Sequence, residues 1–506
     1  MSLPRRPVLK TLGTILVSAG AALALVAAAV APAQAQSRKN QLVLAMVLEP
    51  PSLDPTSSAA AAIGEVVHYN ILEGLTKINV DGSVTPLLAQ DWTESPDGTS
   101  YTFRLKKGVT FSDGSPLDAE AVKFSFDRAK APDSKNKAKK AVFDNVSRVT
   151  VVDPLTLILT LDHADPTMPF RLGENTAVIL HPKSAGQAGT QPIGTGPYVL
   201  ADWKKGSAIT LTARPDARVK PTIQRVTFRI INDPAAQVAA LLAGDVDGMP
   251  RFGALQSVKQ FQSDPRFTVQ IGSTAGKGQL TINNKKKPFD DVRVRRAIMF
   301  AIDRKAVIDG VLEGLGKPIG SHFAPTDVGY VDLTGEYAYD PNKARALLKE
   351  AGVATPLNVT LTLPPPQYAR KGGEVVAAML AQVGIVAKIE NVEWAQWLSG
   401  PFKGNFDLTI IDHVEPLDYM QYTNKSYYWG YDSKTFDDLV KAHAGTTNTA
   451  ERTRYWKQMQ RQLTTDAINA WLFNRSQVLI AKKGLQGLWM NSPIFANDIA
   501  AVRWGP

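Results

Sequence analysis

The chain has 506 residues, which is more than one ordinary hydrophobic core contains, so two or three domains are expected. Its 44% apolar and 21% charged composition is that of a globular protein. The absence of cysteine excludes disulfides, thiolate metal sites, a cysteine nucleophile and a lipid anchor on cysteine, and the net charge of +10 is too scattered to indicate a nucleic-acid partner.

The N-terminal segment has the three-part form of a secretory signal peptide. Arg5, Arg6 and Lys10 precede an uncharged Leu/Val/Ala core, and the small-residue pattern Ala33–Ala35 predicts cleavage after its last residue, so that residues 1–35 are removed. The run is just long enough to span a membrane, which makes an uncleaved anchor the alternative. The arginine pair also resembles a twin-arginine export signal. We expect a cleaved protein, free in the periplasm.

The next segments predict alternating strands, turns and helices. A short apolar strand at 41–45 leads into a proline-rich loop with Ser57 and Ser58, whose small side chains would let a ligand approach the backbone. Between Leu72 and Arg128, the alternation of apolar and polar residues at 101–106 predicts a strand with one buried face. Asp-Gly turns flank this strand, and a helix is expected from about residue 119.

The second half of the chain predicts further strands and well-marked helices. A helix begins at Asn232-Asp233-Pro234, and another begins at the cap Asp340, with proline in its first turn and glycine at its end. A third is expected from about Thr449 to Thr464, with Tyr455, Met459 and Leu463 buried. These helices are interpreted as scaffold.

Several segments together resemble the family 5 extracellular solute-binding proteins of ABC importers, which include the dipeptide- and oligopeptide-binding proteins. The resemblance rests on LEGLTKINVDGSVTPLLAQDW at 72–92, GTGPY at 194–198 and PFDDVRVRRAIMFAIDRKAVIDGVLEG at 288–314, in the family's order over nearly the whole mature chain. It implies an α/β, two-lobed periplasmic binding protein fold of the class II type, with an extra small domain and a cleft that closes by hinge motion.

The resemblance also implies how the chain divides. The first lobe is expected to be discontinuous, and the small domain to be inserted into it. The expected parts are residues 36–75, 188–284 and 485–506 for the first lobe, 76–187 for the small domain and 285–484 for the second lobe.

The expected function is binding rather than catalysis. The six histidines are dispersed without a metalloprotease spacing, no nucleotide-binding loop occurs, and the pair Ser134 and Lys137 lies in a polar loop without the surroundings of an acylating site. No enzyme activity, cofactor or metal is expected. The resemblance implies a monomer that delivers a peptide or peptide-like solute to ABC permease subunits in the inner membrane. A non-peptide solute, opine-like, sugar-like or a metal chelate, is the alternative.

The segment from 392 to 432 is the candidate binding region, because it is rich in aromatics and carries Asp412, Glu415 and Asp418. In the family's peptide binders a Trp is followed three residues later by an Asp that binds the α-amino group, shortly before a Pro. That Trp is absent here and the segment is about four residues shorter, so the three acids compete for the role. Counting back from Pro416 favours Asp412, and counting forward from Phe406-Asp407 places His413 at the Trp position.

Three further residues are candidates for the site. Trp394 matches the family's Glu-Trp pair and is expected to line the pocket. Trp397 lies three residues later on the same expected helix, so at least one of the two tryptophans is expected in the core. Arg370 is a candidate for a ligand carboxylate, with a solvated surface position as the alternative.

Overall fold

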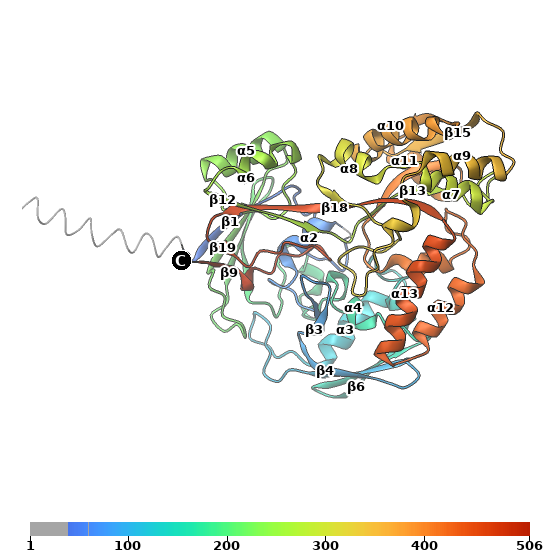
Figure 1. Cartoon of the computed structure of the whole chain (residues 1–506). Helices are drawn as coiled ribbons and strands as arrows, with labels where there is room; N and C mark the ends of the chain where they lie inside the picture. Colours follow the sequence, from blue (N-terminus) through green and yellow to red (C-terminus); the bar gives the residue numbers. More distant parts are fainter. Residues whose placement is uncertain (1–38, 59, 506) are drawn as a thin grey trace, which may run out of the picture.

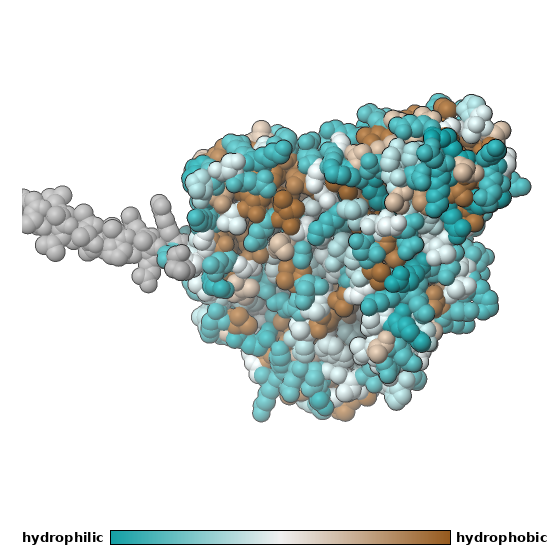
Figure 2. Space-filling view, viewed as in Figure 1, coloured by the Kyte–Doolittle hydropathy of each residue, from teal (hydrophilic) through white to brown (hydrophobic). Residues whose placement is uncertain are grey.

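The computed structural model describes residues 39–505 except residue 59 (Figure 1). The predicted signal peptide, its cleavage site and its arginine pair lie outside these residues. Within the described part of the chain, no helix is long and apolar enough to cross a membrane. On the face shown in Figure 2, hydrophilic and hydrophobic side chains are interspersed.

Lobe I is built on a mixed sheet in which β1 runs parallel to β10 and pairs Leu44 with Phe228. Apolar side chains of this sheet pack on α2, and the C-terminal segment joins the same core through Ile499 and Val502. The indole of Trp504 donates a hydrogen bond to the carbonyl of Gln41 at 3.1 Å. The elements of lobe I are β1 (Gln41–Met46), α2 (Ala61–Val67), β8 (Tyr198–Lys204), β9 (Ala208–Ala213), β10 (Arg225–Ile230), α5 (Pro234–Ala243), β11 (Gly248–Met249), α6 (Val258–Gln262), β12 (Phe267–Ser273), β19 (Leu485–Gln486) and β20 (Arg503–Trp504).

The small domain is a four-stranded antiparallel sheet in the order β4-β5-β7-β6, covered by α3. The predicted alternation is confirmed, since Tyr101, Phe103 and Leu105 are all buried. Helix α3 begins where the Asp118 carboxylate accepts a hydrogen bond from the Ala121 amide. The elements are β2 (Thr76–Ile78), β3 (Val84–Pro86), β4 (Ala89–Glu94), β5 (Ser100–Leu105), α3 (Ala119–Lys130), β6 (Val146–Asp153), β7 (Thr156–Leu161) and α4 (Met168–Arg171).

Lobe II holds the largest hydrophobic core of the described chain, formed between residues 280 and 473. The predicted cap at Asp340 is confirmed, because its carboxylate accepts a hydrogen bond from the Lys343 amide. Helix α13 buries Trp456 rather than the predicted Tyr455, together with Met459 and Leu463. The elements are β13 (Lys277–Ile282), α7 (Val292–Phe300), α8 (Arg304–Leu312), β14 (Gly316–Lys317), α9 (Pro341–Glu350), β15 (Leu357–Leu363), α10 (Gln367–Gln382), β16 (Ile385–Asn391), α11 (Trp394–Ser399), β17 (Leu408–His413), α12 (Lys434–Ala444) and α13 (Thr449–Thr465).

The two lobes are joined by the strand β18 (Asn469–Lys482), which runs from one lobe into the other (Figure 1). Its first residues pair with β13 of lobe II, and its last residues pair with β12 and β11 of lobe I. The turn between β12 and β13 crosses beside it, because the Asn474 amide donates to the carbonyls of Thr274 and Gly276 at 2.7 Å each. One continuous sheet therefore spans both lobes, and the exact residue boundaries between lobes stay predictions.

Candidate functional site

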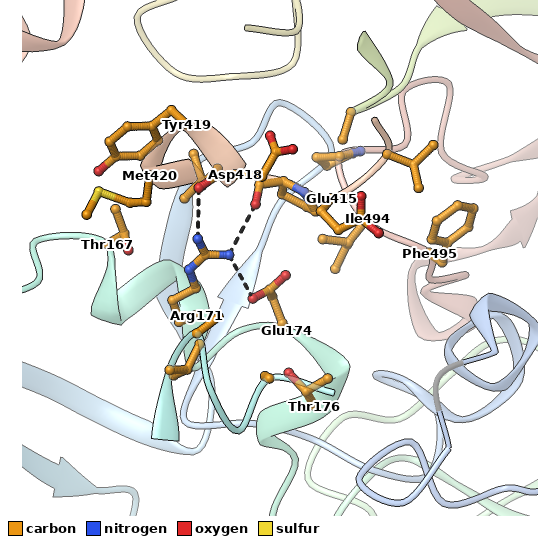
Figure 3. A pocket seen from close by; sticks show the side chains of 18 of the residues that line it. Thr167, Arg171, Glu174, Thr176, Glu415, Asp418, Tyr419, Met420, Ile494 and Phe495 are labelled. Atoms are coloured by element: carbon orange, nitrogen blue, oxygen red, sulfur yellow. Dashed lines mark hydrogen bonds and ion pairs between the residues drawn. The ribbon is translucent and has the colours of Figure 1, made fainter. Parts of the chain in front are cut away.

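A cavity of about 680 Å³ lies where lobe I, the small domain and lobe II meet. The crossing segment at 274–276 and the middle of β18 line this cavity. Both charged and apolar side chains face it (Figure 3). The charged and aromatic residues that line it include His68, Lys137, Lys140, Asp165, Arg171, Glu174, Arg251, Phe252, Glu415, Asp418, Tyr419, His443, Arg475 and Phe495.

Asp418 lies at the edge of this cavity and is already surrounded by basic groups. Its Oδ1 accepts a hydrogen bond from Nζ of Lys277 at 2.7 Å and lies 2.9 Å from Nε2 of His322. Its Oδ2 lies 3.2 Å from Nδ1 of His413, whose Nε2 is 2.8 Å from the hydroxyl of Tyr428. Burial alone would raise the pKa of Asp418, but His322 and Lys277 hold that pKa well below its usual value. The carboxylate is therefore ionised and compensated inside the protein.

The same cluster has the spacing of a metal site, since His322, His413 and Asp418 each offer a ligand atom within 4.8 Å of the others. The Lys277 ammonium, however, bonds to the same Asp418 oxygen that faces His322, and only 2% of its side chain is exposed. A bound cation would have to share that oxygen with a buried ammonium. Lys277 thus takes the position that a cation would need.

Asp412 is the last but one residue of strand β17 and has only 1% of its side chain exposed. Its Oδ2 accepts a hydrogen bond from Nε of Arg475, and its backbone amide donates to the hydroxyl of Tyr368 at 3.2 Å. Gly276 is needed beside it, because a Cβ at that position would lie 2.8 Å from Oδ1 of Asp412. The structure thus uses the charge of Asp412 to hold Arg475.

Glu415 differs from the other two acids because its side chain is exposed and faces the cavity (Figure 3). Among the described residues, its carboxylate makes no ion pair or hydrogen bond. Its backbone carbonyl accepts from Nζ of Lys277 at 2.6 Å, so the loop is fixed while the carboxylate stays available. Of the three competing acids, Glu415 is the one whose carboxylate has no partner in the described part of the chain.

The remaining predicted site residues do not line the cavity. Trp397 is 3% exposed and its indole donates to Thr409 Oγ1 at 3.0 Å, which confirms that one tryptophan belongs to the core. Trp394, predicted to line the pocket, is 42% exposed and meets the ring of Trp397 edge-on. Arg370 forms an ion pair with Glu393 at 3.2 Å. Ser57 and Ser58 lie partly buried in their loop, and His413 is buried beside Asp418 outside the cavity lining.

Sequence reasoning missed the arginines that line the cavity. Arg171 reaches from the small domain into lobe II, where its terminal nitrogens donate to the carbonyls of Pro416 and Leu417 at 3.1 and 2.9 Å (Figure 3). No local pattern marks Arg171 as functional. Arg475, in contrast, is a lone charge in the largely apolar run 470–481, and this pattern in the sequence could have marked it as a candidate site residue.

The buried histidines predict a loss of stability in acid. Burial lowers the pKa of His68 to about 3 and the pKa values of His322 and His443 to about 4, from the ordinary 6.5. The unfolded chain binds protons at these sites below pH 6.5 while the folded protein does not, so the free energy of unfolding falls as pH declines from 6.5 towards 4. The loss is on the order of several kcal/mol for the three together. Urea unfolding at pH 7.5, 5.5 and 4.5 measures it.

A variant of one histidine checks the cause. His68 has no hydrogen-bond partner among the described residues, and it stacks on Tyr69 at 3.9 Å, so His68→Phe replaces it with a ring that does not titrate. This variant will have a shallower pH dependence than the wild type. The matched control His163→Asn changes an exposed histidine and will keep the wild-type slope. Equal slopes in all three proteins would contradict the assignment.

Comparison with known proteins agrees with this architecture. The model of the bacterial extracellular solute-binding proteins, family 5 Middle, matches residues 83–440. The dipeptide-binding protein of Escherichia coli K12 is 31% identical over 422 residues, covering 74% of this chain and 78% of that protein. The structure of AgaA from A. tumefaciens R10 in complex with agropinic acid is 25% identical, covers 92% of this chain and 99% of its own, and has a TM-score of 0.74.

The shared fold extends to more distant proteins. HbpA2 from Haemophilus parasuis is 23% identical, covers 92% of this chain and all of its own, and superposes with a TM-score of 0.83. The fold expected from the sequence, two lobes with an added small domain, is confirmed. The chain therefore belongs to the family 5 extracellular solute-binding proteins, which serve in transport and are not enzymes.

Proposed function

We propose that this protein captures a peptide or peptide-like solute in the cavity between its lobes and delivers it to the permease subunits of an ABC importer. The observation that carries the proposal is the carboxylate of Glu415, which has no partner among the described residues and faces a cavity lined by all three parts of the chain. A peptide ammonium needs such an acid, and side chains such as Met420, Ile494 and Phe495 offer apolar surface to the rest of the solute. The dipeptide-binding relative supports the same solute class.

Hinge motion is the proposed mechanism of capture. The lobes are connected by β18 and by the turn at 274–276, so rotation at these crossing segments opens and closes the cavity. The bonds from Arg171 to Pro416 and Leu417 form only when the small domain and lobe II are in contact. A solute that touches both sides adds to these bonds and favours closure.

A thermal-shift screen with mass spectrometry tests the proposal. Mass spectrometry of the purified protein identifies any co-purifying solute, and a panel of dipeptides and tripeptides is then screened by thermal unfolding. A peptide present at 100 times its Kd will stabilise the fold by about 2.7 kcal/mol and raise the Tm. Failure of every peptide, with a Tm rise in agropinic acid, would instead favour an opine-like solute. That alternative is supported by the AgaA complex and by the pairing of Asp412 and Asp418 within the protein.

The variant Glu415→Gln will weaken binding of the best peptide about tenfold. The expected loss is that of one charge-assisted hydrogen bond at a partly solvated site, about 1.5 kcal/mol. The N-acetylated form of the same peptide has no ammonium, so its affinity will be the same for wild type and variant. Calorimetry measures both, and Glu374→Gln, an exposed change on α10, is the matched control. Equal losses for the free and acetylated peptides would contradict the role of Glu415.

We also propose that the mature protein works as a monomer in the periplasm after cleavage behind Ala35. N-terminal sequencing of the periplasmic fraction tests the cleavage, and light scattering tests the oligomeric state. Replacement of Arg5 and Arg6 by lysine will block export if the twin-arginine route is used. Recovery of the uncleaved chain in the membrane fraction would support the anchor instead.

A further inference from the structure

We infer that Arg475 binds a carboxylate of the solute and makes the site selective for carboxylate-bearing compounds. The inference rests on the proposed function, because it concerns the same cavity. Arg475 lies in the middle of β18, where it pairs with Gly316 of β14 in lobe II and directly precedes the part that pairs with lobe I. Its side chain lines the cavity and is 43% exposed.

The guanidinium of Arg475 is held in place from two sides. Its Nε donates to Asp412, and its Cζ lies 5.3 Å from the centre of the Tyr368 ring. The hydroxyl of Tyr368 accepts from the backbone amide of Asp412, so these three residues fix one another. Gly276 lets the carboxylate of Asp412 approach closely. A guanidinium held in this way loses little conformational entropy when it binds an anion.

The terminal nitrogens of Arg475 are available to a solute. Only Nε has a protein partner among the described residues, which leaves the N–H groups of both terminal nitrogens without one. Two parallel N–H groups match the two oxygens of a carboxylate, and such bidentate pairs are among the strongest hydrogen bonds in proteins. The arrangement therefore matches a site that binds a carboxylate, in which Asp412 orients the guanidinium of Arg475.

The other arginines that line the cavity are engaged by the protein. Arg171 donates to two lobe II carbonyls and lies 3.4 Å from Glu174. Arg251 lies 3.3 Å from Glu65 and donates from its second terminal nitrogen to Ser492 and to a backbone carbonyl. Arg475 thus differs from both in having its two terminal nitrogens unengaged.

The position of Arg475 links anion binding to the hinge. Its backbone carbonyl accepts a hydrogen bond from Thr274 Oγ1 at 3.0 Å. The side-chain amide of its neighbour Asn474 donates to the carbonyls of Thr274 and Gly276 in the other crossing segment. A carboxylate on the guanidinium would therefore be held at the point where the two crossings meet, within reach of both lobes. Solutes without a carboxylate lose this contact.

The inference is tested with pairs of peptides that differ only at the C-terminus. Each peptide of the panel is measured by calorimetry as the free acid and as the amide. Wild-type protein will prefer the acid by 10-fold to 100-fold, as expected for a charge-assisted bidentate pair worth about 1.5–3 kcal/mol. In Arg475→Gln the acid and the amide will bind alike. Arg475→Lys, which keeps the charge and loses the paired N–H groups, will retain part of the preference.

Two further variants control for stability. Arg475→Gln leaves Asp412 buried and unpaired, so the double variant Asp412→Asn/Arg475→Gln removes both charges and will fold while also losing the preference. Arg148→Gln, an exposed change on β6, will keep the wild-type preference. Circular dichroism and the Tm establish that each variant is folded.

The outcomes separate this inference from the proposed function. Equal binding of acid and amide by the wild type, or an unchanged preference in the double variant, overturns the role of Arg475 and leaves peptide capture standing. If no peptide binds but agropinic acid or succinate raises the Tm of the wild type and not of the double variant, the carboxylate role stands and peptide capture falls. If peptides and carboxylates all fail to bind, both are overturned.

Discussion

Replacing Lys277 with methionine will destabilise the protein by about 3–5 kcal/mol at pH 7.5, the cost of removing one partner from a buried ion pair. The ammonium of Lys277 is 2% exposed and lies 2.7 Å from the carboxylate of Asp418, which is 10% exposed. Without the ammonium, this carboxylate would stay in the interior with only the side chains of His322 and His413 beside it. Urea unfolding of both proteins measures the loss.

The double variant Lys277→Met/Asp418→Asn separates the cost of an unpaired charge from the cost of changed packing. It removes both charges and will recover more than half of the lost stability. If it is as unstable as the single variant, the ion pair is not the cause.

Lowering the pH will reduce the loss of stability in the single variant Lys277→Met. In the wild type, the charge of Lys277 helps to keep the pKa of His322 low, so its removal raises that pKa. A raised pKa in the folded state adds stability as pH falls, because the protonated imidazole then compensates Asp418. The difference between wild type and Lys277→Met will therefore shrink between pH 7.5 and pH 5.5. An equal difference in the free energy of unfolding at both pH values would show that the pKa of His322 does not depend on Lys277.

Local patterns in the sequence predict most of the scaffold. The alternation at 101–106 gives strand β5, and the Asp-Pro start at 340 gives helix α9, because both signals act within a few residues. Local patterns do not predict where the chain crosses between the lobes. Strand β18 is one long strand whose two halves belong to different lobes, and only its distant partners β12 and β13 reveal this.

The site is less predictable because the availability of a charge depends on distant partners. The three acids between 412 and 418 are equivalent in the sequence, yet Asp412 is paired with Arg475, Asp418 with Lys277, and Glu415 with no described residue. These partners lie 63 and 141 residues away. Periodicity places Trp394 and Trp397 on one helix, but only packing shows that the second belongs to the core.

Breaking the ion pair between Arg452 and Glu94 will weaken solute binding by 10-fold to 100-fold. Arg452 lies on α13 of lobe II and Glu94 on β4 of the small domain, so the pair exists only when these parts meet. The two terminal nitrogens of Arg452 donate to the two carboxylate oxygens at 2.8 and 2.5 Å, in a partly buried position. Such a bond contributes about 1.5–3 kcal/mol to the closed arrangement.

Its loss will lower the fraction of protein in the closed arrangement, and the apparent affinity for the solute will fall by the same factor. Arg452→Gln and Glu94→Gln will each show the full loss, and the double variant will show little more, because both single changes break the same bond. Calorimetry with the best compound of the screen measures affinity, and small-angle scattering of the unliganded variants will show a larger radius of gyration. The control Arg293→Gln breaks an ion pair with Asp291 within lobe II and will change neither quantity. Additive losses in the double variant would mean that the two residues act separately and that closure does not depend on this pair.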